Sequence, residues 1–222
     1  MRFRDRSEAG RLLAEQLSSY ANRADVLVLA LPRGGVPVAF EVARHLQAPL
    51  DVWLVRKLGA PGIPELAIGA IASGGVETIS TEAARRLAIT HEQLEAITAR
   101  ERQELERREA AYRGSRPLID VRGKTVILID DGIATGASMR AAIASLGRLN
   151  PAQMVVAIPV ASPSTLLDLR SEADGIICLW TPPDLNSVGE WYQDFSQTTD
   201  DEVNTLLESA RDFVARPDQQ AS

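Results

Sequence analysis

Six short apolar runs recur along this chain, each about five residues long and rich in valine and isoleucine. They lack the polar–apolar alternation of a half-exposed strand, which indicates strands that are buried on both faces. Helical patterns separate most of them, and this succession predicts βαβ units and a mainly parallel sheet flanked by helices, an α/β fold. The runs span residues 26–31, 50–55, 67–72, 125–129, 154–160 and 175–179, and the helical stretches span residues 8–20, 36–46, 137–149 and 164–170.

The composition narrows the class of protein. With 45% hydrophobic and 24% charged residues, the chain is neither disordered nor fibrous. Its apolar runs are far shorter than the roughly 20 residues that cross a bilayer, and no apolar stretch follows the basic N-terminal residues, so we expect neither a membrane span nor a secretory signal. The single cysteine, Cys178, excludes an internal disulfide and a cysteine-based zinc site. The net charge of −6 disfavours general nucleic-acid binding, and a cytoplasmic protein is expected.

The most informative segment runs from Thr125 to Ser138. A predicted buried strand is followed by two carboxylates, Asp130 and Asp131, and then by a loop of small residues that opens a helix. The N–H groups of such a loop and the N-terminus of the helix form a cradle for phosphate. The carboxylates would repel phosphate, so they suit sugar hydroxyls or a hydrated Mg²⁺ that accompanies the phosphates. The alternative is a strand-end turn in which Asp131 caps the helix.

Two other predicted strands end in residues that suit an anion. Arg33 supplies a fork of donors, and Gly34 and Gly35 permit a positive φ and a close approach of the backbone. Arg56 and Lys57 follow the run at residues 50–55. The alternatives are a simple turn for the first segment and solvated cations for the second. Because the carboxyl ends of parallel strands meet at one edge of a sheet, we expect these loops to converge with residues 130–138.

The segment at residues 125–138 resembles the signature of type I phosphoribosyltransferases, which bind phosphoribosyl pyrophosphate (PRPP). The resemblance extends over most of the chain, and it is greatest to poorly characterised stand-alone bacterial members. It implies that the two acids hold the ribose hydroxyls, that the small-residue loop holds the 5-phosphate, and that a non-proline cis peptide joins Pro32 to Arg33 in the pyrophosphate loop. The implied PRPP-binding residues are Arg33, Gly34, Gly35, Arg56, Lys57, Asp130, Asp131, Ala134, Thr135, Gly136, Ala137 and Ser138.

The implied activity belongs to nucleotide metabolism and uses Mg²⁺: ribose 5-phosphate passes from PRPP to a nitrogen acceptor, a nucleobase, and pyrophosphate is released. Asp130, Asp131 and Arg33 are the expected catalytic residues, and the two acids are expected to contact the metal through PRPP and water. Catalysis would consist mostly of positioning and charge stabilisation. The alternative functions are a PRPP-binding regulator without turnover and a protein that uses the cradle for another phosphate, although the latter would not need the Arg33 turn.

The acceptor is predicted from two features. Ala134 stands where 6-oxopurine phosphoribosyltransferases have a third acid, which favours a pyrimidine or adenine over guanine and hypoxanthine. Trp191, Tyr192 and Phe195 lie close together in the sequence and are the candidate acceptor-binding residues, as a stacking wall. The alternative is that these rings form a small core.

We expect one domain over residues 1–222 with two additions. The Arg- and Glu-rich residues 81–113 are predicted to form a flexible helical excursion. It is interpreted as a solvated helix or helix pair with a narrow apolar stripe, and the alternative is that it brings Arg107, Arg108 and Arg113 over the site. Residues 182–222 are predicted to form a C-terminal hood. A homodimer is left open.

Overall fold

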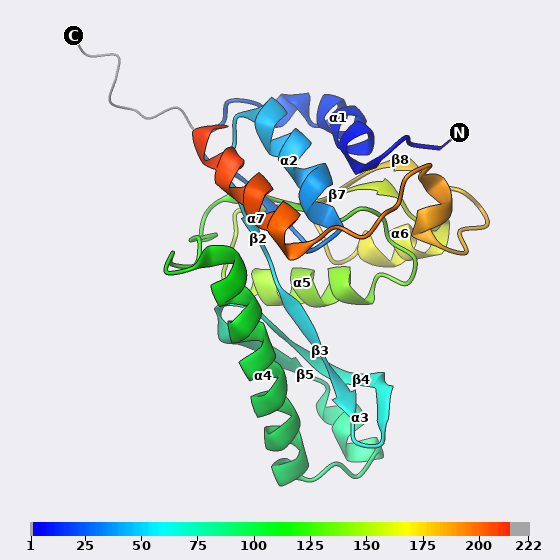
Figure 1. Ribbon diagram of the computed structural model, residues 1–222. Helices are drawn as coiled ribbons and strands as arrows, with labels where there is room; N and C mark the ends of the chain where they lie inside the picture. Colours follow the sequence, from blue (N-terminus) through cyan, green and yellow to red (C-terminus); the bar gives the residue numbers. More distant parts are fainter. Residues whose placement is uncertain (1, 214–222) are drawn as a thin grey trace.

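A five-stranded parallel sheet forms the centre of the protein (Figure 1). The computed structural model describes residues 2–213, with the backbone alone at residues 64–65. The strand order is β2-β1-β6-β7-β8, and helices cover both faces, so the predicted fold class is confirmed. The strands are β1 (Val26–Ala30), β2 (Leu50–Val52), β6 (Thr125–Ile129), β7 (Gln153–Val160) and β8 (Gly175–Trp180), and the flanking helices are α1 (Arg6–Gln16), α2 (Gly35–Leu46), α5 (Ala137–Gly147), α6 (Pro163–Leu169) and α7 (Asp200–Ser209).

Alternate residues of β1, β6, β7 and β8 enter different hydrophobic cores. In β1, Val26, Val28 and Ala30 pack with α1, α2 and α7, whereas Leu27 and Leu29 pack with α5 and α6 on the other face. All five residues of β1 and all five of β6 are buried. Because both faces are covered, these strands need apolar residues at every position, which explains the unbroken runs in the sequence. The edge strand β8 is only partly buried, unlike the fully buried strand that its run predicts.

A second, antiparallel sheet projects from this body (Figure 1). It consists of β3 (Val55–Ala60), β4 (Ile63–Ala72) and β5 (Val76–Ile79). The prediction that residues 67–72 belong to the parallel sheet is therefore wrong, because they form the second half of β4.

The run at residues 50–55 is divided between the two sheets, so the prediction of a single strand is also wrong. Strand β2 ends at Val52 and β3 begins at Val55. Between them Trp53 stays buried and donates a hydrogen bond from Nε1 to Ser145 Oγ over 3.0 Å. The chain thus remains apolar while it crosses from one sheet to the other. Consequently Arg56 and Lys57 lie inside β3 and not after the end of a strand.

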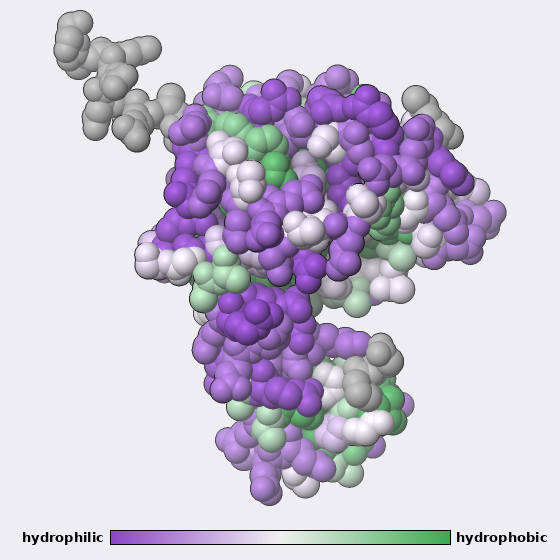
Figure 2. Space-filling model, in the orientation of Figure 1, coloured by the Kyte–Doolittle hydropathy of each residue, from purple (hydrophilic) through white to green (hydrophobic). Residues whose placement is uncertain are grey.

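Residues 81–113 form α3 (Thr81–Arg86) and α4 (His91–Arg113), and α4 packs on the second sheet. Thr90 and Gln93 make a capping box that fixes the start of α4. The buried stripe of α4 includes Leu105 and Tyr112, and the visible face of the helix is hydrophilic (Figure 2). No helix in residues 2–213 is long and apolar enough to cross a membrane.

The chain after β8 returns to the N-terminal helices. Phe3 forms an isolated parallel bridge with Tyr192, and α7 packs against α2 and α4. The predicted hood at residues 182–222 extends beyond the described residues, which end at Phe213. Its described part includes a short helix, Val188–Trp191, and α7.

Candidate active site

The loops after β1 and β6 touch at the carboxyl edge of the parallel sheet. A Cβ atom at Gly34 would lie 2.0 Å from Asp131 Oδ2, and one at Gly35 would lie 2.8 Å from the carbonyl oxygen of Ile129. Gly34 has a φ of −60° and Gly35 has no positive φ, so neither position uses the left-handed conformation that glycine permits. These glycines are needed because the two loops approach so closely. The Pro32–Arg33 peptide bond is cis, as expected.

The loop from Gly132 to Gly136 leads into the N-terminus of α5. Gly136 has a φ of +73°, and Thr135, Ala137 and Ser138 are exposed. Two carbonyl groups of the loop are held by side chains: Thr165 Oγ1 donates to Ala134 O and Arg140 Nη2 donates to Thr135 O, both over 2.7 Å. The first N–H groups of a helix have no partner within the helix. The loop therefore offers amides and hydroxyls to a ligand, which is the donor set of a phosphate cradle.

Asp130 and Asp131 are held in a poorly hydrated environment. Arg6 Nε donates to Asp131 Oδ2 over 2.8 Å. The side chain of Arg6 is 12% exposed and that of Asp131 is 13% exposed. The Tyr192 hydroxyl donates to the main-chain oxygen of Asp131 over 2.6 Å. Burial raises the pKa of both aspartates, and the charge of Asp131 raises that of Asp130 further, whereas Arg6 opposes the shift at Asp131. A carboxylate oxygen in this position can accept a hydrogen bond from a sugar hydroxyl.

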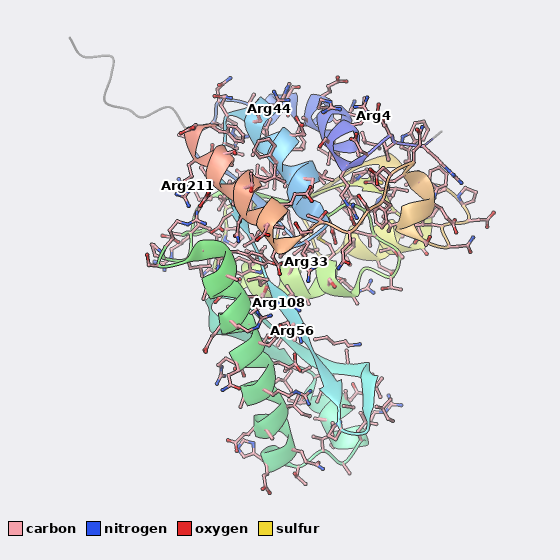
Figure 3. All side chains as sticks on the ribbon, viewed as in Figure 1. Arg4, Arg33, Arg44, Arg56, Arg108 and Arg211 are labelled. Atoms are coloured by element: carbon pink, nitrogen blue, oxygen red, sulfur yellow. The ribbon has the colours of Figure 1, made fainter. Side chains whose placement is uncertain are left out.

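Arg33 extends toward residues of α4 and α7. Its Nε lies 3.1 Å from Asp200 Oδ1, and Asp200 also accepts a hydrogen bond from the Tyr112 hydroxyl. Burial raises the pKa of Tyr112, and the bond to Asp200 adds to the shift, whereas Arg33 lowers it. Arg33, Arg108 and Arg56 follow one another along α4 in Figure 3. Arginines from the turn after β1, from β3 and from α4 itself thus lie along this helix.

Arg56 and Lys57 line a cavity of about 300 Å³ with residues of the β3–β4 turn and of α4. Arg56 Nη2 lies 2.6 Å from Glu101 Oε2. The charged partner that the structure gives Arg56 is thus a residue of α4. The contact of Arg56 and Lys57 with PRPP remains a prediction.

The arginines of residues 81–113 fall into two groups. Arg113 is buried and pairs with Asp51 of β2 over 3.0 Å, so its charge already has a partner within the protein. Arg107 and Arg108 are more exposed, and both pair with Glu104 over 2.8 Å.

The aromatic residues after Pro182 pack around Arg6. Tyr192 is 3% exposed, and its ring stacks on that of Phe195 at 5.1 Å between centroids. The Arg6 guanidinium lies 3.9 Å from the Phe195 centroid. Trp191 is partly buried against the same small cluster. Two of the three candidate rings therefore support the residue that binds Asp131, and stacking on an acceptor remains a prediction.

Sequence reasoning did not find Arg6, Tyr112 or Asp200. All three lie far along the chain from the residues that they contact: 125 residues separate Arg6 from Asp131, and 88 separate Tyr112 from Asp200. The one local indication was the group of acidic residues in the first turn of α7. Acidic residues are common there because they stabilise the N-terminus of a helix, so they did not point to a site.

Comparisons with known proteins agree on one family. A family model described as "Phosphoribosyl transferase domain" matches residues 5–181. Two curated Mycobacterium tuberculosis proteins, from strains H37Rv and CDC 1551 and each named "Putative phosphoribosyl transferase", are 43% identical over 213 residues, or 96% of this chain. The chain spans about half (48%) of the length of these relatives. The crystal structure of TT1426 from Thermus thermophilus superimposes with a TM-score of 0.83 at 47% identity, covering 94% of this chain and 99% of that one.

Proposed function

Because the chain belongs to the phosphoribosyltransferase family, we propose that it transfers ribose 5-phosphate from PRPP to a nitrogen acceptor and releases pyrophosphate. The observation that carries the proposal is the contact between the two loops, in which Gly34 lies directly against the Asp131 carboxylate. The contact supports the proposal, because the Arg33 turn, the two acids and the loop at residues 132–136 lie at one edge of the sheet. PRPP requires these three kinds of group, for its pyrophosphate, its ribose hydroxyls and its 5-phosphate.

Each loop binds a different part of PRPP. The 5-phosphate binds the amides of Thr135 to Ser138 at the start of α5. Asp130 and Asp131 accept hydrogen bonds from the ribose hydroxyls. Arg33 binds the pyrophosphate, and Arg56 and Lys57 add positive charge from β3.

Mg²⁺ fits this donor set. Carboxylate oxygens are hard ligands, and one oxygen of Asp131 is already committed to Arg6. Asp130 and Asp131 would therefore contact the ion through water and PRPP. The ion would supply charge neutralisation for the pyrophosphate.

In the reaction, the bond from C1 of the ribose to the pyrophosphate oxygen breaks, and a bond forms from C1 to the acceptor nitrogen. The electron pair of the broken bond leaves with pyrophosphate, which Arg33 stabilises, and the proton of the acceptor nitrogen is lost to water. Positive charge develops on the ribose ring, where the carboxylates of Asp130 and Asp131 favour it. The chain thus contributes mainly orientation and charge.

The acceptor proposed is a nucleobase, and adenine or a pyrimidine is favoured over guanine and hypoxanthine. Ala134 supports this choice, because it provides no carboxylate to share a proton with N7 of a 6-oxopurine. The Ala134 carbonyl is also bound by Thr165, which occupies a second polar group of that residue.

Pyrophosphate release tests the proposal. The protein is incubated with PRPP and Mg²⁺ and with adenine, uracil, guanine or hypoxanthine in parallel, and release is compared with that of Asp131→Asn. Asp25→Asn, at the opposite end of β1, is the matched control. We expect acceptor-dependent release that only Asp131→Asn abolishes. PRPP binding without release for any acceptor would favour the regulator, and a tenfold preference for guanine would contradict the inference from Ala134.

A further inference from the structure

Arg6 is an interior arginine at the first position of α1. Three contacts from two separate parts of the chain hold its guanidinium: Nε donates to Asp131 Oδ2 over 2.8 Å, Nη1 donates to Ser196 O over 2.8 Å, and the centre of the neighbouring Phe195 ring lies 3.9 Å from Cζ. A guanidinium so poorly hydrated is stable only with such partners. Its position is therefore closely defined.

We propose that Arg6 is a positioning residue that orients the Asp131 carboxylate toward the ribose of PRPP. This inference rests on the proposed function. Arg6 occupies Oδ2 of Asp131, which leaves Oδ1 for a ribose hydroxyl. The terminal torsion of an aspartate has a broad energy minimum, so an unbound carboxylate would sample many orientations.

Residues 192–196 complete the support for Arg6. The Tyr192 hydroxyl fixes the main chain of Asp131, Phe195 covers one side of the guanidinium, and Ser196 accepts its second hydrogen bond. The N-terminal helix and the segment after β8 thus act together on one carboxylate. This gives the aromatic cluster a role in PRPP binding that requires no stacking on the acceptor.

The inference predicts an effect that is selective for the ribose. Loss of Arg6 would disturb the hydroxyl contacts of Asp131 and leave the Arg33 turn intact. PRPP should therefore bind more weakly, whereas Mg²⁺–pyrophosphate, which has no ribose, should bind as before. General damage to the site, or the mere loss of a positive charge, would weaken both ligands.

The experiment measures the binding of PRPP and of pyrophosphate, each with Mg²⁺, by titration calorimetry. Arg6→Ala is compared with the wild type and with Arg4→Ala, an exposed arginine two positions earlier. We expect Arg6→Ala to weaken PRPP binding at least tenfold and pyrophosphate binding less than twofold, and Arg4→Ala to change neither. If thermal denaturation shows that Arg6→Ala is unfolded, Arg6→Gln is used with the same expectation.

A double-mutant cycle with Asp131→Ala tests whether the effect passes through Asp131. In that background, Arg6→Ala should weaken PRPP binding by less than twofold. Equal losses for both ligands, an unchanged PRPP affinity, or additive effects in the cycle would each overturn the inference. A wild-type protein that binds neither ligand would overturn the proposed function, and this inference with it.

Discussion

Close packing of backbone and side chain explains the glycines of the Arg33 turn. No side chain fits at Gly34, because its Cβ would overlap Asp131 Oδ2 at 2.0 Å. The Asp131 carboxylate cannot simply move aside, since Arg6 holds the same oxygen atom. A side chain at position 34 would therefore collide with a carboxylate that Arg6 fixes.

Gly34→Ala should weaken PRPP binding at least tenfold, because either the turn or Asp131 must shift by about 1.4 Å to reach an ordinary contact distance of about 3.4 Å. Gly147→Ala is the matched control, since a Cβ there has no neighbour within 4 Å. Titration calorimetry measures both variants. Wild-type affinity in Gly34→Ala would show that the two loops separate when PRPP binds.

The same reasoning revises the use of Gly136. A branched residue such as valine at Gly136 would test the phosphate site only if the fold tolerated it. In the structure, a Cβ at Gly136 would meet Thr165 Cγ2 at 2.7 Å, and φ is +73°. Such a variant would strain the loop and α6, so Gly34→Ala is the cleaner test.

The thiol of Cys178 is expected to react slowly because it is partly buried. Burial raises the pKa of its thiol to about 11. At pH 8 its thiolate fraction is then about 100-fold lower than that of a free cysteine, whose pKa is about 8.5. Iodoacetamide should therefore alkylate the native protein about two orders of magnitude more slowly than the denatured protein, as followed by mass spectrometry. Equal rates in the two states would contradict this burial.

Asp130, Asp131 and the small-residue loop could be predicted because their chemistry lies in consecutive residues. Arg6 could not be, because an arginine in the first turn of a helix is usually solvated. Only the tertiary structure shows that it pairs with Asp131.

At the scale of elements, α4 is anchored by a buried ion pair. Arg113 and Asp51 are 4% and 8% exposed in their side chains, and Arg113 also donates to Val52 O. The pair fastens the C-terminus of α4 to the end of β2. This fixes the helix that carries Tyr112 and Arg108 beside the site.

Arg113→Leu should reduce the free energy of unfolding by about 3–5 kcal/mol, because Asp51 would remain buried without its partner. Arg107→Leu removes an arginine whose side chain is 67% exposed, and it should change stability by less than about 0.5 kcal/mol. Urea denaturation measures both. Similar stabilities for the two variants would mean that water reaches Asp51.

Apolar runs predicted the parallel strands well and the second sheet poorly. The runs at residues 26–31 and 125–129 are buried on both faces by helices, as the pattern implies. Residues 67–72 are also apolar, since helices cover the second sheet as well, so hydrophobicity does not reveal to which sheet they belong. The division at Trp53 has no signal in composition, because burial continues through it.

At the scale of the whole molecule, the strand order determines which loops lie next to one another. Strands β1 and β6 are neighbours, so the Arg33 turn and Asp130–Asp131 meet at one edge although about 100 residues separate them, as expected for an open α/β sheet. Arg56 and Lys57 belong to the second sheet, so the prediction that they follow a strand of the same sheet fails. The sequence alone shows only that three loops follow apolar runs.

The position of bound PRPP tests the central claim most directly. We predict that a crystal structure with PRPP and Mg²⁺ has the 5-phosphate within hydrogen-bond distance, about 2.7–3.2 Å, of the amides of Thr135 to Ser138. The ribose hydroxyls should contact Asp130 and Asp131, and the pyrophosphate should contact Arg33. A 5-phosphate bound in the cavity of Arg56 and Lys57, with Asp131 still covered by Arg6 alone, would contradict the account.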